Sequence, residues 1–182
     1  MKNIVIATGG TGGHIYPALA FAKCFAKEHK DVKIIFIGSK DRMKAKLIPS
    51  YGYEYYGLDM SGMNGGLVAK MKSAVSLMKA EHWCRNFLRD VKPMCCIGFG
   101  NYISVPLIMA AHKLHIPTMI HEQNSFAGKA NKMLGKYADA IATCYESTND
   151  VFPIEKTRVL GNPQATLAVE QRSEEPSCRE RV

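Results

Sequence analysis

Several features are missing from this sequence, and each absence excludes a class of protein. No apolar run approaches the ~18–20 residues of a membrane-spanning helix. The N-terminus enters an apolar strand pattern after one lysine and lacks a cleavage-site pattern, which predicts no signal peptide. No cysteine pair has C-x-x-C spacing, so a zinc or disulfide site is not favoured. We therefore expect reduced, mostly buried thiols at Cys24, Cys84, Cys95, Cys96, Cys144 and Cys178.

Acidic side chains are also scarce relative to basic ones. The 182 residues include 24 Lys and Arg against 16 Asp and Glu, which gives a net charge of +8. Such a balance favours an anionic partner, which could be nucleic acid, a phosphorylated metabolite or an acidic lipid surface. Aromatic residues are not interleaved with Lys and Arg in any one segment, so nothing supports nucleic-acid binding.

Apolar strand patterns alternate with helical patterns along most of the chain. Continuous apolar strands separated by helices are typical of right-handed βαβ units. The pattern predicts an α/β fold, a Rossmann-like, doubly wound, parallel sheet of about seven strands. The expected strands are 2–7, 32–38, 53–58, 94–98, 117–121, 139–144 and 157–160, and the expected helices are 17–29, 41–48 (stopped by Pro49), 67–90, 104–114 and 128–137. Residues 1–166 form the predicted domain, and residues 167–182 are polar and aperiodic, as in a disordered or non-native tail.

The first glycine-rich loop runs from Thr8 to His14 and joins the first strand to the first helix. Four glycines in five positions allow close approach to a ligand, and helix N-termini attract anions. No Gly-Lys-Ser/Thr follows, which excludes a Walker A loop, and Ile15 breaks the dinucleotide fingerprint. A Rossmann oxidoreductase that binds a nucleotide cofactor remains the alternative, as does a glycine turn that only serves packing. His14 is either a neutral base or a residue that stabilises the loop.

Two more loops follow later strands and end at the same sheet edge. Gly98-Phe99-Gly100-Asn101-Tyr102 leads into a helix, so with the first loop it predicts a wide anion-binding crevice. His121-Glu122-Gln123-Asn124-Ser125 is suited to hydrogen bonding with a sugar or a uracil-like group. It is no zinc-protease motif, because Ser125 stands where the second histidine would be.

Together, these motifs resemble the N-terminal half of the GT-B glycosyltransferases of family 28. The resemblance covers about residues 2–166 and rests on residues 9–15 with Pro17, 98–104, 121–125 with Gly128 and Asn131-Lys132, and 161–163. It implies an inverting N-acetylglucosaminyltransferase of bacterial peptidoglycan synthesis, which uses UDP-N-acetylglucosamine as donor and lipid I (undecaprenyl-pyrophosphoryl-muramoyl-pentapeptide) as acceptor. It also implies a peripheral enzyme at the cytoplasmic face of the cell membrane, with no cofactor and no metal.

The resemblance also implies a role for each site residue. His14 becomes the candidate base, and the donor would contact Thr11, Gly12, Gly13 and Asn124. The acceptor diphosphate would contact Gly10, Gly12, Gly13, Gly98, Gly100, Asn101 and Tyr102, with further polar contacts from His121, Glu122 and Gln123. The chain departs from the family pattern at Lys44, at Asn101, which replaces a usual glycine, and at Gln164-Ala165, which lack a usual arginine. The donor domain would be absent from these 182 residues, so we expect this chain alone to be inactive.

The segment from Lys70 to Lys92 combines basic and apolar residues at helical spacing. Six basic residues stand against two acidic ones, a net charge of +4, and the apolar residues recur at Leu67, Met71, Ala74, Val75 and Met78. Such a stripe is either core with a solvated lysine face or a surface that docks on anionic lipid.

Overall fold

The computed structural model describes residues 2–10, 12–40, 44–60 and 67–165. All seven strands are parallel and form one sheet in the order β3-β2-β1-β4-β5-β6-β7. The strands are β1 (Lys2–Thr8), β2 (Val32–Ser39), β3 (Glu54–Leu58), β4 (Cys95–Phe99), β5 (Thr118–Glu122), β6 (Ala140–Thr143) and β7 (Thr157–Val159). The predicted fold and every predicted strand are confirmed to within about two residues at each end.

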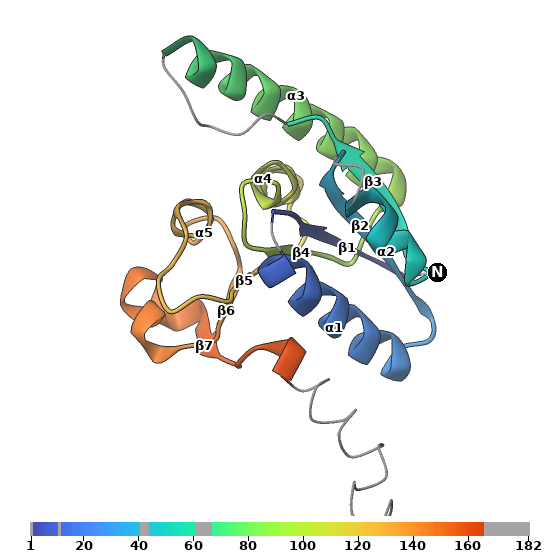
Figure 1. Cartoon of the computed structure of the whole chain (residues 1–182), viewed down its shortest axis with the longest axis vertical. Coiled ribbons are helices and arrows are strands. Elements are labelled where there is room, and N and C mark those ends of the chain that lie inside the picture. The colour runs from blue at the N-terminus through green and yellow to red at the C-terminus, as the bar shows by residue number, and fades with distance from the viewer. Residues whose placement is uncertain (1, 11, 41–43, 61–66, 166–182) are drawn as a thin grey trace, which may run out of the picture.

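Helices cover both faces of the sheet (Figure 1). They are α1 (Gly12–Glu28), α2 (Lys44–Ser50), α3 (Leu67–Val91), α4 (Ser104–Lys113) and α5 (Lys129–Leu134), and two short 3-10 turns, η1 (Glu146–Val151) and η2 (Ile154–Lys156), precede β7. Within the described ranges, no helix combines the length and the apolar character that crossing a bilayer demands.

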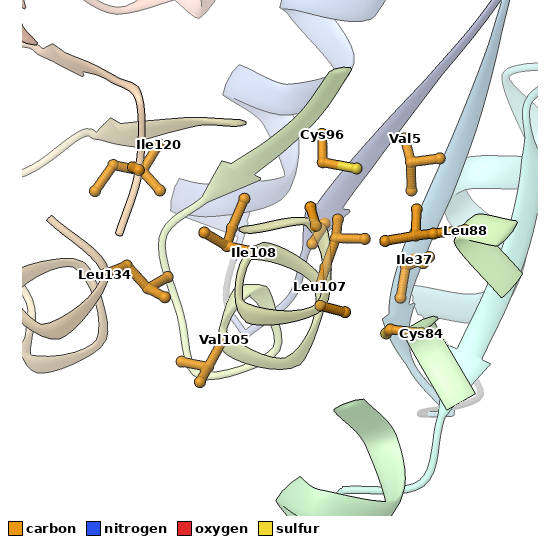
Figure 2. Close-up of a cluster of buried hydrophobic side chains, with 14 of the residues drawn as sticks. Val5, Ile37, Cys84, Leu88, Cys96, Val105, Leu107, Ile108, Ile120 and Leu134 are labelled. Atoms are coloured by element: carbon orange, nitrogen blue, oxygen red, sulfur yellow. The ribbon is translucent and has the colours of Figure 1, made fainter. Parts of the chain in front are cut away.

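The core consists of two layers because successive residues of a strand point to opposite faces. In β1, Val5 and Ala7 pack against α3 and α4, whereas Ile4 and Ile6 pack against α1. Figure 2 shows the first layer, where Cys84 and Leu88 of α3 lie beside strand residues of β1 and β2. A sheet buried on both faces explains why its strands are continuous apolar runs.

Three helix boundaries differ from the prediction. The first helix begins at Gly12 instead of near Pro17, so Pro17 lies inside α1, where it cannot donate a hydrogen bond to the carbonyl of Gly13. The second helix does not stop at Pro49 but includes it in its last turn, where the missing N–H removes one i→i−4 hydrogen bond. The last helix ends at Leu134, and residues 135–137 form turns.

Other sequence predictions have mixed outcomes. The five described cysteines are free, but only Cys84 and Cys96 are fully buried, so thiol burial is less complete than predicted. On α3 the stripe Met71, Val75 and Met78 is exposed, and the core face is formed by Ala80, Cys84 and Leu88. The glycine-rich residues 61–66 and the expected tail at 167–182 lie outside the described residues.

Candidate functional site

The first two loops leave the sheet where its strand order reverses. The chain runs outward from β1 through β2 to β3, and then returns to place β4 on the other side of β1. Thr8 at the end of β1 pairs with Phe99 at the end of β4, so Gly9 and Gly100 begin neighbouring loops. Ligands of doubly wound sheets bind at such a switch point. The topology therefore places both glycine loops in the usual binding position of this fold.

The two loops touch instead of bordering a wide crevice, which corrects the sequence expectation. A side chain on Gly10, whose φ is +78°, would collide with the amide of Asn101. A side chain on Gly100, whose φ is +61°, would collide with the ring of His14. Both positions need glycine, for the backbone conformation and for the space. Gly12 is partly exposed and Gly13 is exposed at the start of α1.

Asn101 itself adopts a φ of 66°, the left-handed conformation that glycine usually fills. Asparagine is among the few other residues that tolerate this region. Ser104 supports the turn because its hydroxyl donates to the carbonyl of Gly100 at 2.5 Å. The replacement of a usual glycine by Asn101 is therefore compatible with the loop, while its buried side-chain oxygen has no hydrogen-bond partner. Tyr102 is half-buried in the next turn.

His14 and Gln123 come together at Gly100. His14 Nε2 lies 2.9 Å and Gln123 Oε1 3.1 Å from the point that a Cβ of Gly100 would occupy. Gln123 is buried, and neither atom of its amide has a partner; His14 Nδ1 is also buried and unpaired. Buried polar atoms are normally paired, so these three atoms require a ligand or water. The unpaired polar atoms of His14 and Gln123 thus form a polar cluster beside Gly100, where the three loops meet.

The electrostatic environment of His14 favours its neutral form. Burial lowers the pKa of His14 below its ordinary value of 6.5, and the nearby Glu122 opposes this shift. Thr8 donates its hydroxyl to the carbonyl of His14 at 3.0 Å, which fixes the backbone just inside α1. A neutral imidazole held in this way can accept a proton from a bound hydroxyl group.

Glu122 organises the third loop from a buried position. Its Oε1 accepts hydrogen bonds from the backbone and side-chain N–H groups of Asn124, both at 3.0 Å. Its Oε2 accepts from the N–H of Gly128 at 2.9 Å and from Nδ2 of Asn131 at 3.0 Å. Only 1% of Glu122 is exposed, whereas Asn124 is exposed and available to a ligand. Glu122 is therefore a support for Asn124 and not a ligand contact, which the sequence did not reveal.

His121 does not belong to the polar cluster that His14 and Gln123 form beside Gly100. As a neighbour of Glu122 in β5, it points to the opposite face, where its ring lies 5.1 Å from that of Phe99. Its Nε2 is 3.0 Å from the carbonyl of Gly161, and burial lowers its pKa. His121 instead borders a cavity of about 250 Å³ with Leu160 and the Gly161-Asn162-Pro163 segment. The substrate contacts predicted for His121, Glu122 and Gln123 stay predictions; of these three residues, Gln123 lies beside His14 at Gly100. Thr11 lies outside the described residues.

Comparisons with known proteins identify the family and the fold of the chain. The chain is 40% identical over 167 residues to the UDP-N-acetylglucosamine–N-acetylmuramyl-(pentapeptide) pyrophosphoryl-undecaprenol N-acetylglucosamine transferase of Bacillus licheniformis, and 40% identical over 161 residues to its counterpart in Parabacteroides distasonis. These matches cover 91% and 88% of this chain but 46% and 44% of the relatives, so the chain spans about half their length.

Solved structures show the same relation. The crystal structure of Acinetobacter baumannii MurG superposes with a TM-score of 0.76 at 28% identity, over 89% of this chain and 46% of that one. A UDP-GlcNAc 2-epimerase from Neisseria meningitidis gives a TM-score of 0.67 at 17% identity, over 96% of this chain and 50% of that one, which shows the fold alone. None of these matches favours the alternative oxidoreductase. Residues 4–143 match the glycosyltransferase family 28 N-terminal domain, and the chain therefore belongs to that family.

Proposed function

We propose that this chain is the acceptor-binding half of an inverting glycosyltransferase that moves N-acetylglucosamine from UDP-N-acetylglucosamine to lipid I. The observation that carries the proposal is the convergence of His14, Gly100 and Gln123 at the switch point of a family 28 domain. The names of the relatives supply the substrates. The proposal covers residues 1–166 as the acceptor domain and leaves most of the donor site to a second domain.

Backbone N–H groups would bind the acceptor diphosphate. The first turn of α1 presents free N–H groups at Gly12 and Gly13, next to the contact between Gly10 and Asn101. The dipole of a 17-residue helix adds to this attraction for an anion. In this proposal Gly100, Asn101 and Tyr102 of the second loop close the other side of the diphosphate, whereas Gly98 is buried within β4.

His14 would then take the proton from the C4 hydroxyl of the muramoyl sugar. The lowered pKa favours a neutral imidazole at neutral pH, and a neutral imidazole can accept a proton. The attacking oxygen would displace UDP at the anomeric carbon, with inversion. Thr11, Gly12, Gly13 and Asn124 would contact the donor from this side, with Glu122 holding the Asn124 side chain in place.

The exposed face of α3 is suited to docking on an anionic membrane surface. Met71 and Met78 are 65% and 62% exposed, and the basic residues Lys72, Lys79 and Arg89 share the exposed part of the helix. Basic groups near such a surface contribute ~1 kcal/mol each. Peripheral docking at the cytoplasmic face would bring the site to its lipid-linked acceptor. Co-sedimentation with vesicles should require anionic lipid and weaken with salt, and salt-insensitive binding would contradict this docking mode.

A chimera tests the proposed reaction. Residues 1–165 would be joined to the C-terminal half of the Bacillus licheniformis relative, and transfer from labelled UDP-N-acetylglucosamine to a lipid I analogue would be measured. His14→Ala should lower kcat more than it changes the acceptor KM, because the base acts on the reacting hydroxyl. His112→Ala, an exposed substitution on α4, serves as the control. If kcat of the His14 variant equals that of the parent, His14 has a structural role only.

A further inference from the structure

A groove separates α3 from the ends of β2 and β3. Its volume is about 830 Å³. Leu58 and Asp59 at the end of β3 and Lys40 after β2 form one wall, and residues of α3, among them Val75 and Trp83, form the other. Figure 1 shows α3 running along this edge of the sheet and projecting beyond it. A space of this size is typical of a small-molecule site.

We propose that this groove binds the isoprenoid chain of a lipid-linked diphosphate. The inference rests on the proposed function, because it takes the occupant to be the tail of the acceptor whose diphosphate binds at the glycine loops. It differs from membrane docking, since it assigns a single hydrocarbon chain to a concave site instead of placing an exposed helix face on a bilayer.

The position of the groove fits this occupant. All strands are parallel, so the ends of β2 and β3 lie at the same edge of the sheet as the glycine loop that follows β1. Neighbouring strands are ≈ 4.8 Å apart, which places Lys40 about one strand and Asp59 about two strands from that loop. A chain attached to a diphosphate at the first loop would therefore have to cover about 5–10 Å along the ends of the strands to reach the groove.

The chemistry of the lining also fits a prenyl diphosphate. Leu58, Val75 and Trp83 provide an apolar wall, and the Trp83 ring is held by stacking on Phe87 at a centroid distance of 5.0 Å. Prenyl chains are apolar and unsaturated, and aromatic rings offer large apolar contact areas to them.

The lining of the groove contains three lysines and one acidic residue. Lys40, Lys72 and Lys79 line the groove together with Asp59. Lys40 and Asp59 are 3.8 Å apart, but both side chains are strongly exposed, so this pair is weak and leaves the rim basic. The basic rim would attract an anionic lipid-linked ligand toward the groove, while its diphosphate binds at the neighbouring glycine loops; a neutral apolar peptide would gain nothing from the lysines.

Trp83 makes the groove directly observable, because it is the only tryptophan of the chain. The 182-residue chain would be titrated with geranylgeranyl diphosphate below its micelle concentration, without vesicles, and the fluorescence of Trp83 recorded. We expect a saturable change with the prenyl diphosphate and none with inorganic pyrophosphate. Equal changes with both ligands, or no change with either, would overturn the proposal.

Two matched substitutions locate the binding. Val75 in the groove is 46% exposed, and Met94, at the opposite edge of the sheet, is 47% exposed. Val75→Glu should weaken prenyl diphosphate binding at least about tenfold, because it places a charged, hydrated carboxylate against the apolar tail. Met94→Glu should leave the affinity within about twofold. Equal losses in both variants, with circular dichroism showing both folded, would refute the groove.

A second titration separates this inference from the proposed function. A water-soluble lipid I analogue without the prenyl chain tests the headgroup site alone. If the analogue binds while the prenyl diphosphate leaves Trp83 unchanged, the groove assignment is wrong and the function stands. If the prenyl diphosphate binds through Val75 and the analogue does not bind, the groove stands as a prenyl site and the assigned acceptor is wrong.

Discussion

Replacing Glu122 by glutamine should test the buried network that supports the third loop. All four groups that contact the Glu122 carboxylate are N–H donors. A carboxylate can accept all four, but a glutamine amide presents an NH₂ group to one of the two pairs. Whichever way the amide lies, two N–H groups then face a donor. Leaving a buried donor unpaired costs ~1–3 kcal/mol, so the upper bound is roughly 6 kcal/mol.

The structure indicates which pair is lost and lowers the estimate. Asn131 is 1% exposed, whereas Asn124 is exposed and can turn its N–H groups to water. The amide oxygen should therefore stay with Gly128 and Asn131, and the NH₂ group should displace Asn124. We expect the free energy of unfolding to fall by about 2–3 kcal/mol, which at an m-value of ~2 kcal/mol/M shifts the urea midpoint by about 1–1.5 M.

Urea unfolding followed by circular dichroism measures this shift, and NMR should show the side-chain amide of Asn124 moving toward its solvent value. Glu155→Gln, at an exposed position, is the matched control and should change stability by less than about 0.5 kcal/mol. A loss below about 1 kcal/mol for Glu122→Gln, or an unchanged Asn124 signal, would refute the reasoning.

Three further predictions concern the glycine contacts, the histidines and the isolated chain. Gly100→Ala should weaken binding of a lipid I analogue in calorimetry, because the added methyl group meets the His14 ring. Gly52→Ala is the control, since its φ of +84° gives similar backbone strain but no atom lies within 4 Å of the added methyl group. The control should keep full affinity. In NMR titrations His14 and His121 should protonate below pH 6.5, because burial lowers the pKa of each. Because the unfolded chain binds protons more readily, the free energy of unfolding should be highest above pH 6.5 and should fall as the pH decreases through the folded-state pKa values. The His14→Asn variant should show a weaker dependence of this free energy on pH. The purified 182-residue chain should form no lipid II from UDP-N-acetylglucosamine and a lipid I analogue, because transfer depends on a donor held in line with the acceptor. Formation of product would contradict the proposed division of the site between two domains.

The alternation of apolar strands and helices was enough to predict the sheet, because both follow from local periodicity. Helix boundaries were harder to predict from sequence. Gly12 and Gly13 have poor helix propensity, yet they form the first turn of α1, where the loop geometry and not propensity decides. The exposed stripe at Met71 and Met78 has the same spacing as a core stripe, so only the packing of α3 distinguishes the two.

The sequence was enough to predict that three loops form the candidate site, but not which residues of these loops contact one another. Strand periodicity puts His121 and Glu122 on opposite faces, and this could have been inferred from their adjacency in β5. The contact of Gly10 with Asn101 and of Gly100 with His14 depends on loop conformations that the sequence leaves open. The groove beside Trp83 had no sequence signature, because its walls come from three separate segments.

The distribution of charge separates two tasks within this domain. Residues 8–14, 98–102 and 121–125 contain no Lys or Arg, although the chain carries a net charge of +8. A diphosphate at the glycine loops would therefore be held by N–H groups and a helix dipole. The charged group near His14 is the carboxylate of Glu122, which opposes the lowering of the His14 pKa by burial. The lysines instead line α3 and the groove rim, where, in the proposed docking mode, exposed charges would attract anionic lipid over about a Debye length. Salt should thus weaken attachment to the membrane far more than it weakens binding of the headgroup, because only the first depends on exposed point charges.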